Sequence, residues 1–112
     1  MNIQIFGTLK CFDTKKAQRY FKERNIKFQF VDLKEKGLSK GELENVERAV
    51  GLAELINKNS KDYEKLNFHK IGSSVMKKEI LLNNAQLYNT PIVRNGKNAT
   101  VGYKPEIWET WE

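Results

Sequence analysis

Cysteine, histidine and proline are scarce in this chain of 112 residues, which has one cysteine, one histidine and two prolines. A single cysteine cannot close an internal disulfide, as is expected of a protein from the reducing cytoplasm. The one histidine, His69, gives no cluster of metal ligands and is predicted to lie at the surface. No apolar run approaches the length of a membrane span and no secretory pattern begins the chain, so no membrane association is expected.

The net charge is +6, from 20 Lys and Arg against 14 Asp and Glu. This excess favours anionic partners such as phosphate, arsenate, glutathione or nucleic acid. The lysines are interleaved with acidic residues all the way from Lys10 to Lys104, so there is no basic stripe and direct nucleic-acid binding is not expected. With 39% hydrophobic residues, the chain suits one core, and we predict a single domain over residues 1–112.

The cysteine lies between a short apolar run and a helical pattern. Residues 3–6 predict a buried strand, and the helical face that follows Cys11 predicts a helix ending near Asn25. Asp13 or Thr14 is expected to cap this helix, because each side chain can accept a hydrogen bond from a first-turn amide. Cys11 is therefore expected on a strand-to-helix turn.

A thiolate at this position has several sources of stabilisation. Free amides and the positive end of the helix dipole favour the thiolate form of Cys11, and Lys10, Lys15 and Lys16 add nearby positive charge. We expect a lowered thiol pKa. The alternative interpretation is that Cys11 is a small buried hydrophobic residue, and Lys10 and Lys15 are also compatible with a purely surface role.

The middle of the chain is predicted to be helical. An alternating second strand over residues 27–33 is expected to pair in parallel with the first. A helical insertion over about 38–88 follows, in which Ser39 and Glu42 have capping-box spacing at the start of a helix over 40–50.

Later in this insertion we expect short helical pieces over 52–56 and after Ser60, then a helix that begins at Ser73 or Ser74 and runs to Leu82. Met76 is at core spacing there and is predicted to pack inside.

The end of the chain returns to strands. Residues 91–94 and 99–103 flank an Asn-Gly turn and predict an antiparallel hairpin. Pro105 suits the first turn of a closing helix, and at least one of the two tryptophans is expected to dock on the sheet. The predicted order is β-α-β, a helical block, then β-β-α.

This order, together with several local sequences, resembles a known family. The local sequences are Gly7 to Ala17, Phe28 to Asp32, Asn59 to Leu66, Thr90 to Val93, and Val101 to Tyr103. They resemble the glutaredoxin-dependent arsenate reductases of the ArsC family and the related Spx regulators, and look most like uncharacterised single-cysteine members. The resemblance implies an α/β, thioredoxin-like fold with a mixed four-stranded sheet and a helical insertion.

The resemblance also implies roles for individual residues. Cys11 corresponds to the nucleophilic cysteine, and Pro91 to a cis-proline whose backbone faces the thiol. Arsenate-reducing members hold the oxyanion with three arginines, where this chain has Asn57 or Lys58, then Thr90, then Lys104. Because lysine supplies only a point charge and Asn or Thr only neutral contacts, arsenate affinity is expected to suffer.

Arg94 is a possible substitute for the missing arginines, although a solvent-facing strand charge is the favoured interpretation. Where Spx regulators usually carry a second cysteine, this chain has Thr14, so any oxidised state must be a mixed disulfide. Thr14, a helix cap on one view, would also stabilise the thiolate, while Thr90 and Pro91 would align a peptide-like substrate.

These features give one leading functional hypothesis and two alternatives. The leading hypothesis is a monothiol oxidoreductase acting through Cys11, with no bound cofactor and with glutathione or a glutaredoxin-like protein as the reductant. The alternatives are an arsenate reductase proper and an Spx-like regulator that binds RNA polymerase without turnover. A protein client trapped as a mixed disulfide is a further expected partner of the oxidoreductase.

Overall fold

The computed structural model describes residues 1–111, and its elements follow the predicted order. The strands are β1 (Ile3–Gly7), β2 (Phe28–Asp32), β3 (Ile92–Asn95) and β4 (Asn98–Val101). The α-helices are α1 (Phe12–Glu23), α2 (Lys40–Val50), α3 (Leu52–Leu55), α4 (Lys61–Lys65), α5 (Ser74–Asn83) and α6 (Pro105–Trp108). Short 3-10 turns cover Phe68–Lys70, Ala85–Leu87 and Glu109–Trp111.

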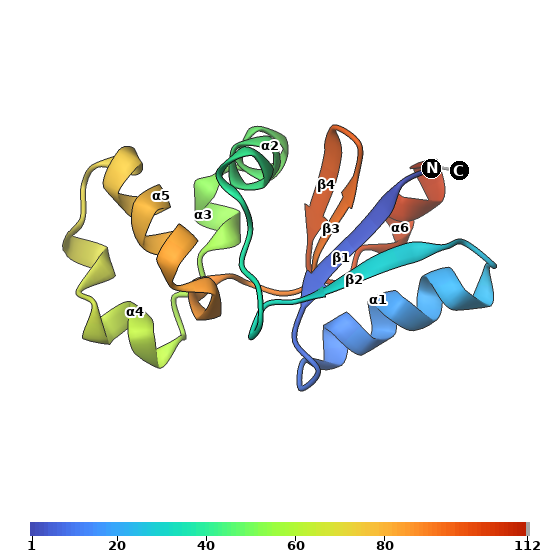
Figure 1. Cartoon of the computed structure of the whole chain (residues 1–112), viewed down its shortest axis with the longest axis horizontal. Helices are drawn as coiled ribbons and strands as arrows, with labels where there is room; N and C mark the ends of the chain where they lie inside the picture. Colours follow the sequence, from blue (N-terminus) through green and yellow to red (C-terminus); the bar gives the residue numbers. More distant parts are fainter. Residues whose placement is uncertain (112) are drawn as a thin grey trace.

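The four strands form one mixed sheet in the order β2-β1-β3-β4. β1 pairs with β2 in parallel, whereas β1–β3 and β3–β4 are antiparallel. Figure 1 shows α1 running along one side of this sheet and the helical segment between β2 and β3 gathered at the other end of the molecule. The expected α/β, thioredoxin-like arrangement with a mixed four-stranded sheet is confirmed.

Alternation along the strands divides the core into two clusters. Ile3 and Ile5 of β1 pack with the buried face of α1 and with Trp108 of α6. Phe6 of β1 and Ile92 of β3 face the opposite way, into a second cluster shared with α2 and the rest of the helical segment. Because successive strand side chains point to opposite faces, one short strand supplies both cores.

The C-terminal helix is fixed to the sheet through a tryptophan, as predicted. Trp108 is 1% exposed and its Nε1 donates a 2.8 Å hydrogen bond to Thr100 Oγ1 on β4. Its ring also makes an edge contact with Tyr20 of α1, with centroids 5.1 Å apart. The closing helix thus covers the same sheet face as α1.

The helical segment is anchored where it leaves and rejoins the sheet. Ile56 and Tyr88 form an antiparallel bridge, flanked by hydrogen bonds of 2.8 Å from Asn57 N to Leu87 O and from Asn89 N to Leu55 O. We call these paired segments, residues 55–57 and 87–89, the junction. It holds Asn57 near Thr90, which continues the chain from the second segment toward β3.

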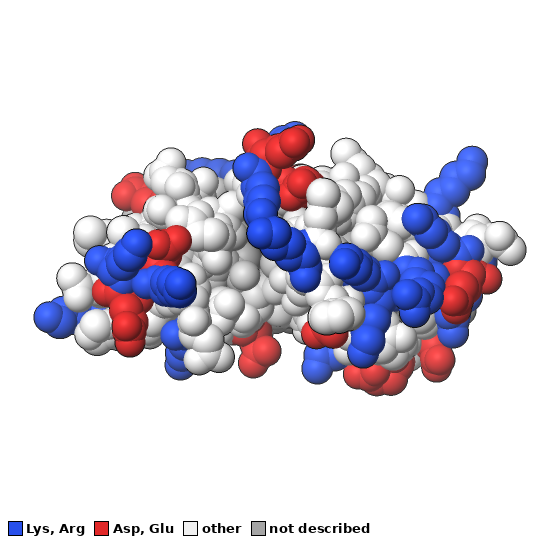
Figure 2. All heavy atoms as spheres, turned by 90° about the horizontal axis from the view of Figure 1, so that it is seen from below, with Lys and Arg blue, Asp and Glu red and all other residues white. Residues whose placement is uncertain are grey.

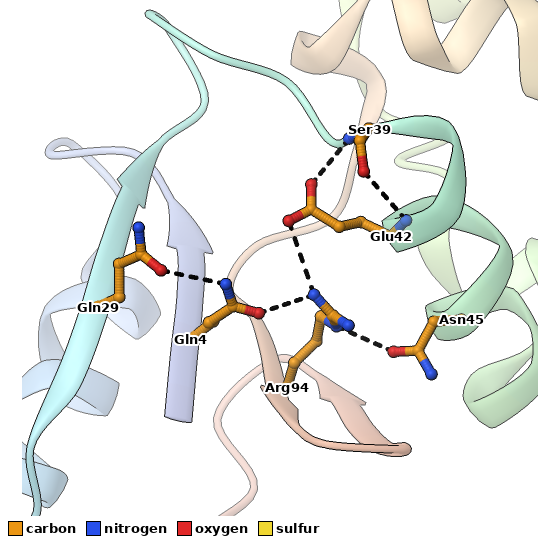
Figure 3. Close-up of polar contacts among 6 residues, drawn as sticks. All are labelled: Gln4, Gln29, Ser39, Glu42, Asn45 and Arg94. Atoms are coloured by element: carbon orange, nitrogen blue, oxygen red, sulfur yellow. Dashed lines mark hydrogen bonds and ion pairs between the residues drawn. The ribbon is translucent and has the colours of Figure 1, made fainter. Parts of the chain in front are cut away.

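Arg94 belongs to a polar network between β1, β3 and α2 rather than to the solvent. It donates to Gln4 Oε1 at 2.7 Å and to Asn45 Oδ1 at 2.9 Å, and lies 3.6 Å from Glu42 Oε2 (Figure 3). Glu42 also completes the predicted capping box with Ser39. The expectation of a solvent-facing charge was wrong, because a polar patch of α2 lies over this face of the sheet.

Two other local expectations were also wrong. The N-cap of α1 is Cys11 itself, and the described residues provide it with no side-chain cap, so Asp13 and Thr14 fall within the first turn. Met76 is 55% exposed on α5, while Leu81 supplies the buried side chain of that helix. By contrast, Asn25 has φ 58° just past the end of α1, as expected of a C-terminal asparagine.

Candidate active site

The candidate site is built around the turn that joins β1 to α1. Cys11 has extended backbone angles, φ −79° and ψ 121°, and the helix begins at the next residue. Its backbone N–H donates to Thr8 O at 3.2 Å, which closes the turn. The half-buried sulfur therefore stands at the N-terminus of a helix of 12 residues, where unpaired amides and the helix dipole favour negative charge.

Thr90 is the second residue that meets the sulfur. Thr90 Oγ1 donates to Cys11 Sγ at 3.1 Å, whereas the thiol can reach the Thr90 carbonyl only at 3.8 Å. Cys11 Sγ accepts the shorter of these two contacts, and a hydrogen bond of this kind is strengthened when the sulfur is ionised. The peptide bond between Thr90 and Pro91 is cis, as the resemblance implied.

Thr14 approaches the sulfur from inside the helix. Its side chain is fully buried, and its hydroxyl makes no hydrogen bond of standard geometry within the described residues. It fits there because Gly7 has no side chain, and a Cβ at Gly7 would overlap Thr14 Oγ1 and Cγ2. The buried hydroxyl therefore remains a donor for the neighbouring sulfur, to which it lies close enough to affect the thiol pKa.

Opposing effects set the pKa of Cys11, and the net direction is downward. Partial burial raises the thiol pKa, but it is outweighed by the hydroxyls of Thr14 and Thr90 together with the backbone N–H groups of Thr14 and Asp13. Each of these donors stabilises the thiolate and not the thiol. Hydrogen bonds therefore account for the direction of the shift, and Asp13 contributes through its amide.

The lysines around the turn are exposed. Lys10 and Lys15 face the solvent, and the Nζ of Lys15 lies 5.8 Å from the ring centre of Phe12. Figure 2 looks toward the α1 side, where Lys and Arg side chains gather more densely than acidic ones. Leu9 and Phe12, on either side of the cysteine, are 63% and 80% exposed.

A cavity of about 600 Å³ adjoins the thiol, since Thr90 and Thr8 belong to its wall. Its lining residues are Thr8, Leu33, Lys34, Asn57, Ala85, Gln86, Tyr88 and Thr90. Two predicted site residues, Asn57 and Thr90, thus meet there. Lys104, exposed at the N-cap of α6, and Arg94 do not line this cavity.

Lys34 and Gln86 were missed by the sequence reasoning. The position of Lys34 could have been predicted, because it directly follows the predicted second strand. Parallel strands end at the same edge of a sheet, which is also the edge where Cys11 follows the first strand. Nothing in the sequence predicted the position of Gln86, since it depends on how the helical segment folds back toward the sheet. His69 is exposed as expected.

Known proteins share the sequence pattern and the fold of this chain. The sequence model of the ArsC family matches residues 6–111. The chain belongs to the ArsC family. Among ArsC-related sequences, it is 28% identical over 106 residues to "Global transcriptional regulator Spx 2" of Oceanobacillus iheyensis, covering 92% of this chain and 78% of that one. An uncharacterised protein of Haemophilus influenzae is 26% identical over 110 residues, covering 96% of both chains.

Solved structures share the fold of this ArsC-family chain. An arsenate reductase from Vibrio cholerae superposes with a TM-score of 0.86 at 21% identity, covering 96% of this chain and 94% of that one. The YffB (PA3664) protein superposes with a TM-score of 0.83 at 23% identity, covering 96% of both. Within residues 1–111, no helix is long and apolar enough to cross a membrane, and no three His, Cys, Asp or Glu side chains group as metal ligands.

Proposed function

We propose that this ArsC-family chain is a monothiol oxidoreductase of the reducing cytoplasm, in which Cys11 reduces disulfides with the help of glutathione or a glutaredoxin-like protein. The observation that carries the proposal is the 3.1 Å hydrogen bond from Thr90 Oγ1 to Cys11 Sγ at the start of α1. A thiolate held at a helix N-terminus by hydroxyl and amide donors is a reactive nucleophile near neutral pH.

The reaction runs in two thiol–disulfide exchanges. The Cys11 thiolate attacks one sulfur of an oxidised disulfide, so that a bond forms between Cys11 and that sulfur while the other sulfur leaves as a thiolate and takes a proton from water. A second thiol, as its thiolate, then attacks the sulfur bound to Cys11. This step forms a new external disulfide and releases the Cys11 thiolate. One external thiol is needed in the second step because Cys11 is the chain's only cysteine.

Arsenate reduction proper is less well supported than disulfide exchange. Among the described residues that line the cavity beside Cys11, Lys34 is the only cation and none is an arginine. Arg94 is bound to Gln4 and Asn45 in the network beneath α2. A tetrahedral oxyanion would therefore lack the planar, two-pronged contacts that arginine provides.

A second candidate is a regulator that binds RNA polymerase without turnover. The observation in its favour is the 28% identity with a protein named as a global transcriptional regulator. The exposed Leu9 and Phe12 would suit a protein contact. A regulator of this kind should keep its partner when Cys11 is changed to serine, whereas a client held as a mixed disulfide should be lost.

The proposal is tested by intact mass and by turnover. Wild type and Cys11→Ser are incubated separately with oxidised glutathione and with arsenate plus glutathione and glutaredoxin. We expect one glutathione adduct on wild type, none on Cys11→Ser, and no arsenate-dependent turnover. Absence of any adduct on folded wild type would contradict the oxidoreductase assignment, and a polymerase pull-down that survives Cys11→Ser would then favour the regulator. Arsenate-dependent turnover would instead identify the protein as an arsenate reductase.

A further inference from the structure

A groove separate from the cavity beside Cys11 lies between α1 and the segment that enters α6. We call it the α1 groove, and its walls include Lys16, Arg19, Tyr20, Glu23 and Arg24 on one side and Tyr103 on the other. The residues of the first side recur at helical spacing, so they lie along one face of α1 over about 12 Å. The groove measures about 330 Å³ and shares no lining residue with the cavity beside Cys11.

The charge on this side of the molecule is mostly positive. From Phe12 to Arg24 there are five Lys and Arg residues against two acidic ones. None of the five forms an ion pair within residues 1–111. Figure 2 shows Lys and Arg side chains gathered on the α1 side. Unpaired positive charge beside a groove attracts a ligand of the opposite charge.

Two of the cations in the groove lie against aromatic rings. The guanidinium carbon of Arg24 lies 3.6 Å from the centre of the Tyr20 ring, and Arg24 Nη1 donates to the Tyr20 carbonyl at 3.3 Å. The Nζ of Lys16 lies 5.3 Å from the centre of the Tyr103 ring. Side chains restricted in this way lose less conformational entropy on binding an anion than freely rotating surface cations do. This restriction distinguishes the groove from an ordinary solvated helix face.

The spacing of the cations and the position of the rings decide which anion fits. A single phosphate needs donors that converge on one point, whereas Lys16, Arg19 and Arg24 follow one another along the helix. An extended ligand with several separate negative charges matches this spacing. Single-stranded nucleic acid stacks its bases on open ring faces, but Arg24 covers Tyr20, which is 4% exposed, and Lys16 lies over Tyr103. Carboxylate side chains need no such surface, so the ligand class is an acidic peptide.

We propose that the α1 groove is a docking site for an acidic peptide segment of a protein partner, whose Asp or Glu side chains pair with Lys16, Arg19 and Arg24. Charge complementarity favours this occupant over a second copy of the chain, because two copies joined through this face would bring like-charged helices together. Glu23 is the one acidic residue named in the wall, and it opposes a carboxylate at its own position. The inference goes beyond the proposed function, since neither Cys11 nor its hydrogen-bond donors take part.

The site is tested by fluorescence anisotropy with a labelled oligoglutamate peptide, and with an oligoglutamine peptide as the uncharged comparison. Physiological ionic strength is used because it screens distant charges. We expect saturable binding of oligoglutamate alone. Arg19 makes no ion pair or hydrogen bond through its side chain within residues 1–111, so Arg19→Gln should leave the fold intact and weaken binding about threefold. Arg48→Gln removes the same charge from an exposed position on α2 and should leave binding unchanged.

Glu23 provides a test of the opposite sign. Glu23→Gln should strengthen oligoglutamate binding about threefold, whereas Glu44→Gln, at an exposed position on α2, should not. Equal effects of Arg19→Gln and Arg48→Gln, or no binding of oligoglutamate by folded wild type, would overturn the inference. Tighter binding of labelled oligothymidine that Arg19→Gln weakens would also overturn it, and would assign the groove to nucleic acid. Cys11→Ser should bind oligoglutamate like wild type, so failure of the redox chemistry leaves this test intact.

Discussion

The hydroxyl of Thr90 should control how much of Cys11 is thiolate at neutral pH. In wild type, the hydrogen bonds of the site outweigh partial burial and lower the thiol pKa, so the midpoint of Cys11 alkylation should lie below about 8.5. Thr90→Val keeps the shape of the side chain and removes the donor that lies 3.1 Å from the sulfur. The midpoint should therefore move upward in this variant.

The size of the effect follows from the strength of one hydrogen bond to a charged group. Such bonds contribute about 1.5–3 kcal/mol, and Cys11 is only half-buried, so we take the lower end of that range. At 1.36 kcal/mol per unit, the pKa should rise by about one unit. Because a more basic thiolate is also a better nucleophile, with a Brønsted slope of about 0.4–0.5, the tenfold loss of thiolate should appear as a roughly threefold loss of rate below the midpoint.

The assay is the rate of iodoacetamide alkylation as a function of pH for wild type, Thr90→Val and Thr90→Ser. The Thr90→Val curve should lie about threefold below wild type at neutral pH and about threefold above it on the alkaline plateau. Thr90→Ser, which keeps the hydroxyl, should follow wild type. A Thr90→Val curve with an unchanged midpoint, or one lowered equally at every pH, would refute the assignment of Thr90 as a donor to the thiolate.

Three further substitutions test close contacts of the fold by urea unfolding. Gly7→Ala should reduce the free energy of unfolding by about 1–3 kcal/mol, because its Cβ would overlap Thr14, and adding Thr14→Ala should recover part of the loss. Arg94→Met should cost about 1–3 kcal/mol by leaving partners of the α2 network unpaired, with the alkylation midpoint of the cysteine unchanged. Trp108→Phe should lower the free energy of unfolding by about 1–3 kcal/mol, because it leaves the buried hydroxyl of Thr100 without its donor.

Each of these expectations has a matched comparison. Gly41→Ala adds a methyl group on α2 where nothing lies within 4 Å, and should be neutral or stabilising. Lys97→Met removes an exposed charge near the hairpin turn and is the control for Arg94→Met. Equal stability of Gly7→Ala and Gly41→Ala would contradict the close packing of Thr14. A shifted alkylation midpoint in Arg94→Met would show that Arg94 acts on the thiol after all.

The cap of α2 and the hairpin turn were predicted correctly, because each is determined by a few neighbouring residues. The capping box of Ser39 and Glu42 predicted the start of α2. The Asn-Gly sequence predicted the hairpin, in which Gly96 has φ 61°. These features depend on backbone hydrogen bonds within one turn, so no knowledge of the tertiary fold was needed.

The remaining features depend on contacts between distant segments. The sequence around Arg94 predicts a charge at the surface of a strand. Its partners become evident only when α2 is placed over the sheet. Met76 follows the spacing of a core residue, yet the apolar face of α5 turns Leu81 inward instead. The cavity beside Cys11 likewise required the positions of Lys34 and Gln86, which come from separate elements. The family resemblance supplied Cys11, Pro91, Asn57 and Thr90, but not Lys34 or Gln86.

The junction allows the part of the helical segment that follows α2 to vary without disturbing the sheet. Two short stretches, residues 55–57 and 87–89, pair across the base of the segment. Asn57 within the first stretch and Thr90 just after the second both line the cavity. A related chain could therefore acquire different helices after α2, and with them a different cavity wall, while keeping Cys11, its hydrogen-bond donors and the face of α2 that packs on the sheet. Ligand choice and thiol reactivity in this scaffold can thus diversify separately, provided that the paired base is retained.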